Sequence, residues 1–195
     1  MKKILIFSVI ALVSFSFCSP NKKDNRKNTV KTVDQMPDST MNRIDERGYI
    51  VKVGDKAPDF TIKYIDGKTA HLSDLKGKTV MLQFTASWCG VCRKEMPFIE
   101  SDIWQKYRNS ENFVLIGIDL KEDVETVEKF TESTGITYPI VLDEDGKIFE
   151  LYADKDAGVT RNVLIDKDGN IHFMTRLYDE EEFESLKQNI RKLIE

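Results

Sequence analysis

The sequence from residue 84 to residue 97 reads Phe84-Thr85-Ala86-Ser87-Trp88-Cys89-Gly90-Val91-Cys92-Arg93-Lys94-Glu95-Met96-Pro97. Its two cysteines are separated by two residues and follow directly after an apolar run at 80–84. Apolar residues then recur at spacings of three and four, the period of a helix with one buried face: Cys92, Met96, Ile99 and Ile103. This pattern predicts a strand, a short turn and a helix, with Cys89 at the N-terminus of the helix.

A helix N-terminus changes the chemistry of a thiol. The free N–H groups and the positive end of the helix dipole favour a thiolate over a thiol. A lowered thiol pKa would make Cys89 the better nucleophile at neutral pH. Cys92 lies one turn further along, so it can attack the Cys89 sulfur and close a small disulfide. The pair therefore predicts a dithiol that exchanges with other disulfides.

These residues resemble a known family. The segment Trp88-Cys89-Gly90-Val91-Cys92 is similar to the active-site motif of the thioredoxin superfamily. The segment Arg93-Lys94-Glu95-Met96-Pro97 is similar to its TlpA/ResA-like, membrane-tethered branch of thiol-disulfide oxidoreductases, which is related to the AhpC/TSA proteins. The resemblance extends from about Val53 to the C-terminus. It implies an α/β, thioredoxin-like fold: a central mixed β-sheet flanked by helices, with an N-terminal β-hairpin and a helix-strand insertion.

Hydrophobic patterning places elements along the predicted domain, residues 49–195. Consecutive apolar residues predict buried strands at 79–84, 113–119 and 139–142. Helices are predicted at 124–134, 146–152 and 180–194. Two β-hairpins are predicted, at 60–65 with 69–72 and at 162–166 with 171–175. The first is expected to turn through two residues, Asp66-Gly67.

The start of the chain has a different composition. Two lysines and an apolar run to Phe17 are typical of a signal peptide, so residues 1–18 are interpreted as a signal peptide or lipoprotein signal. Cys18 resembles the lipidation site of a bacterial lipoprotein, although Phe17 stands where a small residue is usual. The alternatives are a retained short membrane anchor, or ordinary cleavage after residues 14–16 that leaves a free Cys18. Residues 19–48 are polar and without period, which predicts a flexible linker.

Composition limits the classes of function. The chain has 195 residues, of which 41% are hydrophobic and 32% charged, values that suit one soluble globular domain with short extensions. The net charge is −4, and no basic stretch is long enough to follow a phosphate backbone. We therefore expect no nucleic acid among the partners.

Glu95 is the candidate base. It lies three residues after Cys92, which places both on roughly the same helical face. Partial burial beside the apolar stripe would raise its pKa and suit it to take a proton from Cys92. Position 95 also matches the active-site glutamate of ResA-like proteins. Thioredoxins instead use an aspartate six residues before the first cysteine, and Gln83 occupies that position here.

Three further residues are candidates for substrate binding. Trp88 is expected to shield one side of the Cys89 sulfur and to contribute to a docking surface, or to belong to the core. The segment Gly158-Val159-Thr160 matches the family loop that usually ends in a cis-proline, with Thr160 in the place of proline. A cis bond costs about 2.5–4 kcal/mol before a non-proline residue, so we expect a trans Val159–Thr160 bond. We also expect the Thr160 hydroxyl to contact a cysteine sulfur.

Two other functions remain open. The pair Thr160-Arg161 resembles peroxiredoxins, which indicates a thiol peroxidase, but Ala86 and Leu82 stand where peroxiredoxins carry a threonine and a proline. A periplasmic copper carrier could use Cys89 and Cys92 as soft ligands. Zinc would need a second pair of ligands and haem attachment would need a histidine after Cys92, and the sequence has neither. We expect no metal and no cofactor, because the dithiol itself carries the electrons.

The resemblance implies an extracytoplasmic thiol-disulfide oxidoreductase that acts on protein substrates through Cys89 and Cys92. A reductant is favoured, for example one used in cytochrome c maturation. Its implied partners are protein thiols and disulfides, a membrane electron donor, and a membrane reached through lipid on Cys18. We expect a monomer at the periplasmic side of the cell envelope.

The lipid anchor gives a first test. Mass spectrometry of the mature protein from its native host is expected to find the chain beginning at Cys18 and carrying lipid. A soluble product that begins at Phe17 and has a free thiol would contradict this prediction.

Overall fold

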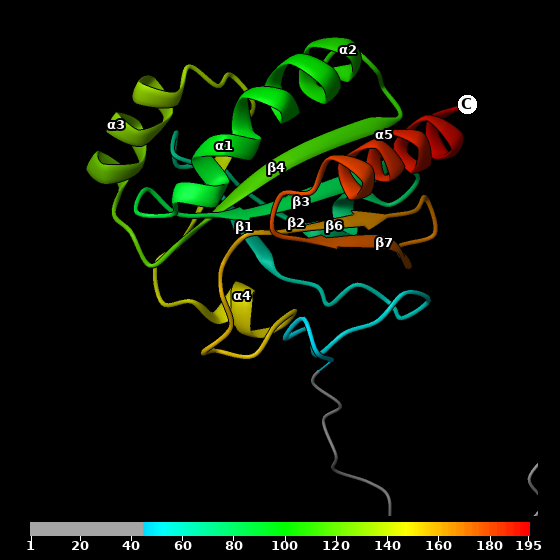
Figure 1. The fold of residues 1–195 in the computed structure, drawn as a ribbon, viewed down its shortest axis with the longest axis horizontal. Helices are drawn as coiled ribbons and strands as arrows, with labels where there is room; N and C mark the ends of the chain where they lie inside the picture. The colour runs from blue at the N-terminus through cyan, green and yellow to red at the C-terminus, as the bar shows by residue number, and fades with distance from the viewer. Residues whose placement is uncertain (1–44) are drawn as a thin grey trace, which may run out of the picture. The chain divides into compact units, whose positions relative to one another are not determined.

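The structure is a computed structural model that describes residues 45–195. The predicted signal, Cys18 and most of the predicted linker lie outside the described residues, so those predictions are not addressed by it. Helices and strands follow one another through the described chain (Figure 1). The strands are β1 (Thr61–Lys63), β2 (Thr69–His71), β3 (Thr79–Thr85), β4 (Phe113–Leu120), β5 (Ile140–Asp143), β6 (Arg161–Ile165) and β7 (Ile171–Arg176). The helices are α1 (Gly90–Phe98), α2 (Gln105–Tyr107), α3 (Val124–Thr134), α4 (Lys147–Glu150) and α5 (Glu180–Ile194), with a 3₁₀ turn at Leu72–Leu75 and a π-helical segment at Ile99–Trp104.

The central sheet has five strands in the order β5-β4-β3-β6-β7. β3 pairs in parallel with β4, and β4 in parallel with β5, whereas β6 and β7 are antiparallel to their neighbours. The sheet is therefore mixed, as predicted, and this is the thioredoxin-like α/β fold. β1 and β2 form a separate two-stranded sheet, the predicted N-terminal hairpin.

β3 is the middle strand, and its sequence explains why. All seven of its residues are buried, because it has a strand on either side and helices over both faces. A strand buried on both faces reads as a continuous apolar run, which is the pattern at 79–84. Of its three polar residues, Thr79 begins the strand, whereas Gln83 and Thr85 lie near its C-terminal end, the end that leads to the cysteines.

Helices cover both faces of the sheet (Figure 1). α1 and α5 lie together on one face, where Phe98 of α1 stacks on Tyr178 at 5.3 Å between ring centroids. α4 lies on the other face, where Phe149 meets Phe84 of β3 edge to face at 5.7 Å. The sheet therefore separates the polar groups on the α1 and α5 face from the aromatic side chains that pack under α4.

The active-site helix changes character after Pro97. Proline has no N–H, so it cannot donate a helical hydrogen bond. α1 ends at Phe98, and the π-helical segment Ile99–Trp104 follows directly. The apolar stripe is nevertheless kept, because Cys92, Met96, Ile99 and Ile103 are all fully buried. The predicted helix and its buried face are confirmed.

The first hairpin differs from its prediction. The Tyr64 N–H donates to Lys68 O at 2.9 Å, and the Gly67 N–H donates to Tyr64 O at 2.9 Å. The loop therefore contains three residues, 65–67, and not the two that were predicted. Gly67 has a φ of +84°, which lets a three-residue loop close with a left-handed last residue. β1 therefore ends at Lys63 and not at residue 65, whereas β2 begins at Thr69 as predicted and ends at His71, where the 3₁₀ turn begins.

Hydrogen bonds join the start of the described chain to the sheet. The Asp45 carboxylate accepts the Arg47 and Tyr49 N–H groups at 2.9 and 2.8 Å. The Tyr49 hydroxyl is fully buried and donates to Thr175 O at 2.6 Å. Arg47 donates to Met174 O at 3.3 Å. These contacts begin before residue 49, where the folded domain was predicted to start.

The aromatic layer under α4 can be tested by mutation. Phe84 is fully buried against Phe149 and Tyr152. Phe84→Ala is expected to lower the free energy of unfolding by about 3–5 kcal/mol, because it removes buried apolar contacts and leaves a cavity. Urea denaturation measures the change. The control Val53→Ala, at a side chain that is 55% exposed, is expected to stay within about 0.5 kcal/mol of wild type. A similar loss in both variants would contradict the assignment of Phe84 to the core.

Candidate active site

The cysteine pair lies where β3 ends and α1 begins. Cys89 is the residue that caps the N-terminus of α1, and its sulfur accepts the Cys92 N–H at 3.1 Å. The two cysteines form a disulfide, with their Cα atoms 5.3 Å apart. The expected position of Cys89 at the helix N-terminus is confirmed. Both cysteines are largely enclosed, since Cys89 is only 7% exposed and Cys92 is fully buried.

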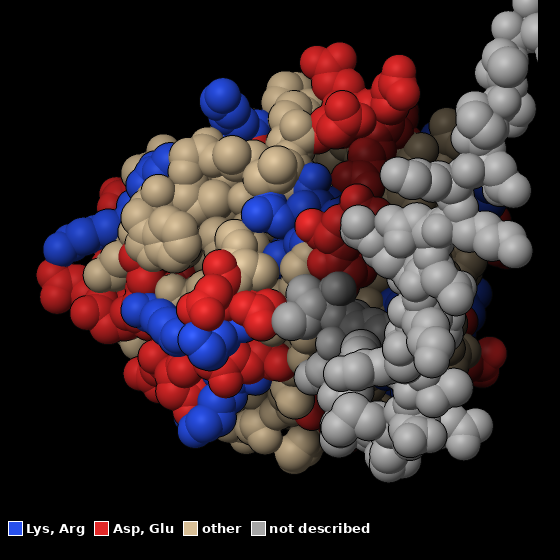
Figure 2. Space-filling model, turned by 60° about the horizontal axis from the view of Figure 1, so that its bottom comes forward, with Lys and Arg blue, Asp and Glu red and all other residues tan. Residues whose placement is uncertain are grey.

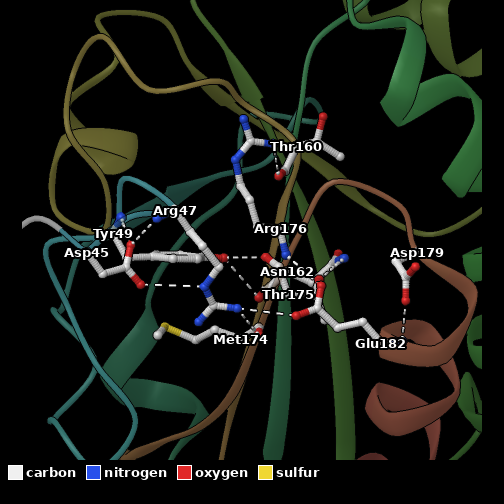
Figure 3. Close-up of polar contacts among 10 residues, drawn as sticks. All are labelled: Asp45, Arg47, Tyr49, Thr160, Asn162, Met174, Thr175, Arg176, Asp179 and Glu182. Carbon is white, nitrogen blue, oxygen red and sulfur yellow. Dashed lines mark hydrogen bonds and ion pairs between the residues drawn. The ribbon is translucent and has the colours of Figure 1, made fainter. Parts of the chain in front are cut away.

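Thr160 touches both sulfurs. Its hydroxyl lies 3.2 Å from Cys89 Sγ and 3.4 Å from Cys92 Sγ, which is the contact expected from the sequence. The backbone holds the residue in place, because Thr160 O accepts the Leu177 N–H at 3.2 Å and the Arg176 guanidinium at 3.1 Å (Figure 3). The trans conformation of the Val159–Thr160 bond stays a prediction.

Glu95 is a buried residue of α1. It is 1% exposed, and its carboxyl accepts the Asn162 side-chain amide at 2.6 Å. Desolvation raises the pKa of Glu95 to about 7, opposed by the hydrogen bond from Asn162 and reinforced by the nearby charge of Glu182. The expected burial and raised pKa are confirmed. The Glu95 carboxyl is hydrogen-bonded to Asn162 and not to a cysteine.

Asn162 joins Glu95 to the rest of the sheet. Its side-chain amide also donates to Thr175 Oγ1 at 2.9 Å, and its backbone carbonyl oxygen accepts the Tyr49 hydroxyl at 3.3 Å (Figure 3). The sequence analysis did not single out Asn162. A polar residue inside the apolar strand 161–165 was the available signal, but its partner Glu95 is 67 positions away in the sequence. Asn162 lies on β6 beside β3, and Glu95 lies on α1, which follows β3, so only the tertiary fold brings the two residues together.

Trp88 and Val159 lie differently. Trp88 is 65% exposed, so of the two roles considered for it the docking surface fits and the core does not. Val159 is buried at 3% exposure, and its backbone N–H and C=O have no hydrogen-bond partner among residues 45–195. Those two groups are free to pair with an extended peptide.

Arg161 points away from the disulfide. Its guanidinium lies over the Tyr49 ring at 4.4 Å and over the Phe149 ring at 5.7 Å, and it donates to Arg47 O at 2.9 Å. These aromatic partners belong to the α4 face of the sheet, whereas Glu95 lies on the α1 face. The contact between arginine and sulfur that the peroxidase alternative needs is therefore not made.

Two observations concern metals and membranes. Residues 45–195 bring together no group of three or more His, Cys, Asp or Glu side chains that could hold a metal ion. Within the same residues, no helix combines the length and the apolar character needed to cross a bilayer.

A disulfide at a helix N-terminus, carried on a β-α-β unit of a mixed five-stranded sheet, defines a thiol-disulfide oxidoreductase with the thioredoxin fold. Comparison with known families agrees, since the Redoxin family model matches residues 52–190. The chain belongs to this family and is a TlpA/ResA-like member of the thioredoxin superfamily.

Individual relatives support the assignment. The chain is 32% identical over 128 residues to the thiol-disulfide oxidoreductase ResA of Bacillus thuringiensis (strain Al Hakam), which covers 66% of this chain and 70% of the relative. A solution structure described as a candidate protein disulfide isomerase from Bacteroides thetaiotaomicron is 61% identical, with a TM-score of 0.73 and coverage of 75% of this chain and 92% of that one. A crystal structure described as a candidate thiol:disulfide interchange protein DsbE from Chlorobium tepidum is 28% identical, with a TM-score of 0.65 and coverage of 74% and 99%.

The buried acid makes stability depend on pH. Glu95 has a pKa of about 7 in the folded protein and 4.5 as its ordinary value, so the folded state binds the proton more tightly and loses stability as the pH rises between those values. Glu95→Gln is therefore expected to be more stable than wild type at pH 8, by up to about 3 kcal/mol, with no such gain at pH 4. Urea denaturation at both pH values measures this.

The matched control is Glu111→Gln, at an exposed acid, which is expected to change stability by less than about 0.5 kcal/mol at either pH. An equal effect of Glu95→Gln at pH 4 and pH 8 would show that Glu95 is not buried as a neutral acid.

Proposed function

We propose that this protein is an extracytoplasmic reductant of disulfides in protein substrates. The observation that carries the proposal is the disulfide itself, with Cys89 partly accessible, Cys92 enclosed, and both sulfurs in contact with a neutral hydroxyl. This arrangement gives the two cysteines unequal roles.

In the reduced protein, the Cys89 thiolate attacks a substrate disulfide. A mixed disulfide forms with Cys89, and one substrate sulfur leaves as a thiolate that takes up a proton. Cys92 then loses its proton and attacks Cys89 Sγ, which forms the Cys89–Cys92 disulfide and releases the second substrate thiolate. Two electrons and two protons pass to the substrate, and a separate donor must reduce the protein again. Cys92 suits the second step because it is fully buried, beyond the reach of a large substrate.

A peptide can dock beside the disulfide. The free backbone groups of Val159 can pair with an extended substrate strand, and the exposed indole of Trp88 offers an apolar surface next to the Cys89 sulfur. Charges of both signs are interspersed on the face shown in Figure 2, and an area without charged groups lies at its upper left.

The surroundings of the sulfurs favour a reductant. A positive group beside the attacking thiolate stabilises the reduced form and makes the disulfide oxidising. Among residues 45–195, no Lys, Arg or His hydrogen-bonds either sulfur, and the nearest polar side chain is the hydroxyl of Thr160. Glu95, the buried acid of α1, disfavours a second negative charge on the nearby cysteines. Both facts oppose the effect of the helix N-terminus, which stabilises the Cys89 thiolate, and they favour the disulfide state and so a low reduction potential.

Glu95 is proposed to accept the proton that Cys92 releases. A carboxyl with a pKa of about 7 can take up and return a proton at neutral pH. Asn162 and Thr160 belong to β6 and the loop before it, so the acid and the sulfurs are positioned by one segment. Glu95→Gln should accordingly flatten the pH dependence of exchange.

The remaining parts of the proposal concern the cellular setting. A lipid on Cys18 would hold the domain at the periplasmic side of the cell envelope, with the predicted linker as spacer. A membrane electron donor would keep Cys89 and Cys92 reduced, and the protein would act as a monomer. Cytochrome c maturation is one process that needs such reduced cysteines.

Single cysteine variants test the mechanism. Cys89→Ser is expected to abolish reduction of a disulfide substrate, because it removes the attacking thiolate. Cys92→Ser is expected to accumulate mixed disulfides through Cys89, visible by mass spectrometry, because the resolving thiol is missing. Cys18→Ser is the matched control and should leave exchange by the purified protein unchanged. Faster alkylation of Cys92 than of Cys89 by iodoacetamide would reverse the roles.

The reduction potential tests the direction. Equilibration with a glutathione or dithiothreitol couple is expected to give a value nearer to that of thioredoxin, about −270 mV, than to that of DsbA, about −120 mV. A value near −120 mV would identify an oxidant and contradict the proposal.

A further inference from the structure

The turn that carries Trp88 and Cys89 is held at Ser87 from two sides. The Glu122 carboxylate accepts both the Ser87 N–H at 2.6 Å and the Ser87 hydroxyl at 2.5 Å. From the other side, Arg93 Nε donates to Ser87 O at 2.9 Å. All the polar groups of Ser87 are therefore used, and the residue directly before Trp88 is fixed.

Glu122 reaches Ser87 because of an unusual residue at the end of β4. Lys121 has a φ of +60°, a left-handed conformation that is uncommon for a residue with a side chain. The chain turns at this residue, and the carboxyl of Glu122 reaches Ser87, beyond the C-terminal end of β3. The Lys121 side chain packs against Gly146 instead of facing the carboxyl, since a Cβ on Gly146 would lie 2.2 Å from Lys121 Cε.

A second carboxyl, that of Asp119, interacts with Glu122 and has no hydrogen-bond donor among the described residues. Asp119 is fully buried, and neither of its carboxyl oxygens has a partner among the described residues. It pairs in register with Thr85 of β3, but the Thr85 hydroxyl donates to Met96 Sδ at 3.7 Å. On the β5 side its register partner is the apolar Leu142. A buried carboxylate with no donor is costly, so this site favours the neutral acid.

We propose that Asp119 and Glu122 form a carboxyl pair that shares one proton and thereby positions the Ser87–Trp88–Cys89 turn. With the proton on Asp119, its O–H faces the carboxyl group of Glu122, whose two oxygens accept the two hydrogen bonds from Ser87. Loss of the proton places two negative charges side by side, which repel each other and weaken the hold on Ser87. Asp119 and Glu122 are positioning residues, because neither touches a sulfur.

The charged groups around the pair support this reading. Burial first, and then the charge of Glu122, raise the pKa of Asp119 to about 8. Lys121 acts on Asp143 and not on Asp119. Arg93 lies over the Phe130 ring at 4.8 Å and bonds Ser133 and Ser87 O, so it does not neutralise the pair either. The hydrogen bonds from Ser87 to Glu122 therefore hold the turn below about pH 8, and they weaken above that pH.

The test follows Trp88 in the oxidised protein, in which the cysteines do not titrate. A Trp104→Phe, Glu95→Gln background leaves Trp88 as the fluorescent indole and removes the buried acid of α1, while the buried Asp143 of β5 is present in every variant. Fluorescence is expected to change with a midpoint at about pH 8. Asp119→Asn is expected to abolish this transition. Glu122→Gln is expected to move it to lower pH, because removal of the neighbouring negative charge lowers the pKa of Asp119.

The matched control is Glu125→Gln, at an exposed carboxyl on α3 that pairs with Lys129, and it should leave the midpoint unchanged. A transition that survives in Asp119→Asn, or a midpoint that does not move in Glu122→Gln, would overturn the proposal, as would no transition in the background protein. If a variant does not fold, the ¹³C shift of the Asp119 carboxyl in the wild-type protein supplies the same midpoint, and a value near pH 4 would equally overturn it.

This inference rests on the proposed exchange reaction only in its effect on rate. Glu122→Gln is expected to slow exchange about tenfold at pH 7, as for the loss of one charge-assisted hydrogen bond. A Glu122→Gln variant that exchanges slowly but has the wild-type reduction potential would support the positioning role. An unchanged exchange rate in this variant would overturn it. Failure of the exchange reaction in every variant and in wild type would instead refute the proposed function, and the fluorescence titration would still decide on the pair.

Discussion

The junction between β3 and α1 is the constraint on which the rest of the structure depends. Cys89 must cap the helix, lie close to the surface, and still face the loop that carries Thr160. A strand buried along all seven residues fixes one side of the junction, and Pro97 with the π-helical segment after it bends the helix on the other side. The sheet is built so that β6 and β7, which arrive late in the chain, deliver Thr160 and Asn162 to the same place.

Two buried acids, Glu95 and Asp119, lie near this junction, and neither of them stabilises the folded protein. Glu95 and Asp119 both have raised pKa values because water has been removed from them, so each lowers the stability of the folded protein at neutral pH. A hydrophobic residue in either place would avoid that cost. The two acids differ in their partners, since Glu95 receives a hydrogen bond from Asn162 whereas Asp119 faces another carboxyl. The first environment suits proton exchange with a thiol, and the second couples a backbone turn to pH.

Much of this architecture could be predicted from local patterns. The helices α3 and α5 have the predicted bounds, because their apolar spacing and their aspartate caps are complete within the sequence itself. Cys89, Cys92 and Glu95 could be found because they share one helix and one motif. Asn162, Asp119 and Glu122 could not, since their roles depend on strand register across long separations in sequence. The extra residue in the first hairpin was missed because Asp66-Gly67 fits a two-residue turn equally well in sequence.

The position of residues 45–49 has a mechanical consequence. Asp45, Arg47 and Tyr49 are bonded to one another and to β6, β7 and Glu182 of α5 (Figure 3). Any force applied through the preceding chain therefore enters the domain at the edge formed by β6 and β7. At this point the Arg161 guanidinium stacks on the Tyr49 ring, and both side chains are buried, so the attachment includes packing contacts as well as hydrogen bonds. A protein anchored through its N-terminus could thus be pulled and turned at a surface while the disulfide and its loop keep their shape.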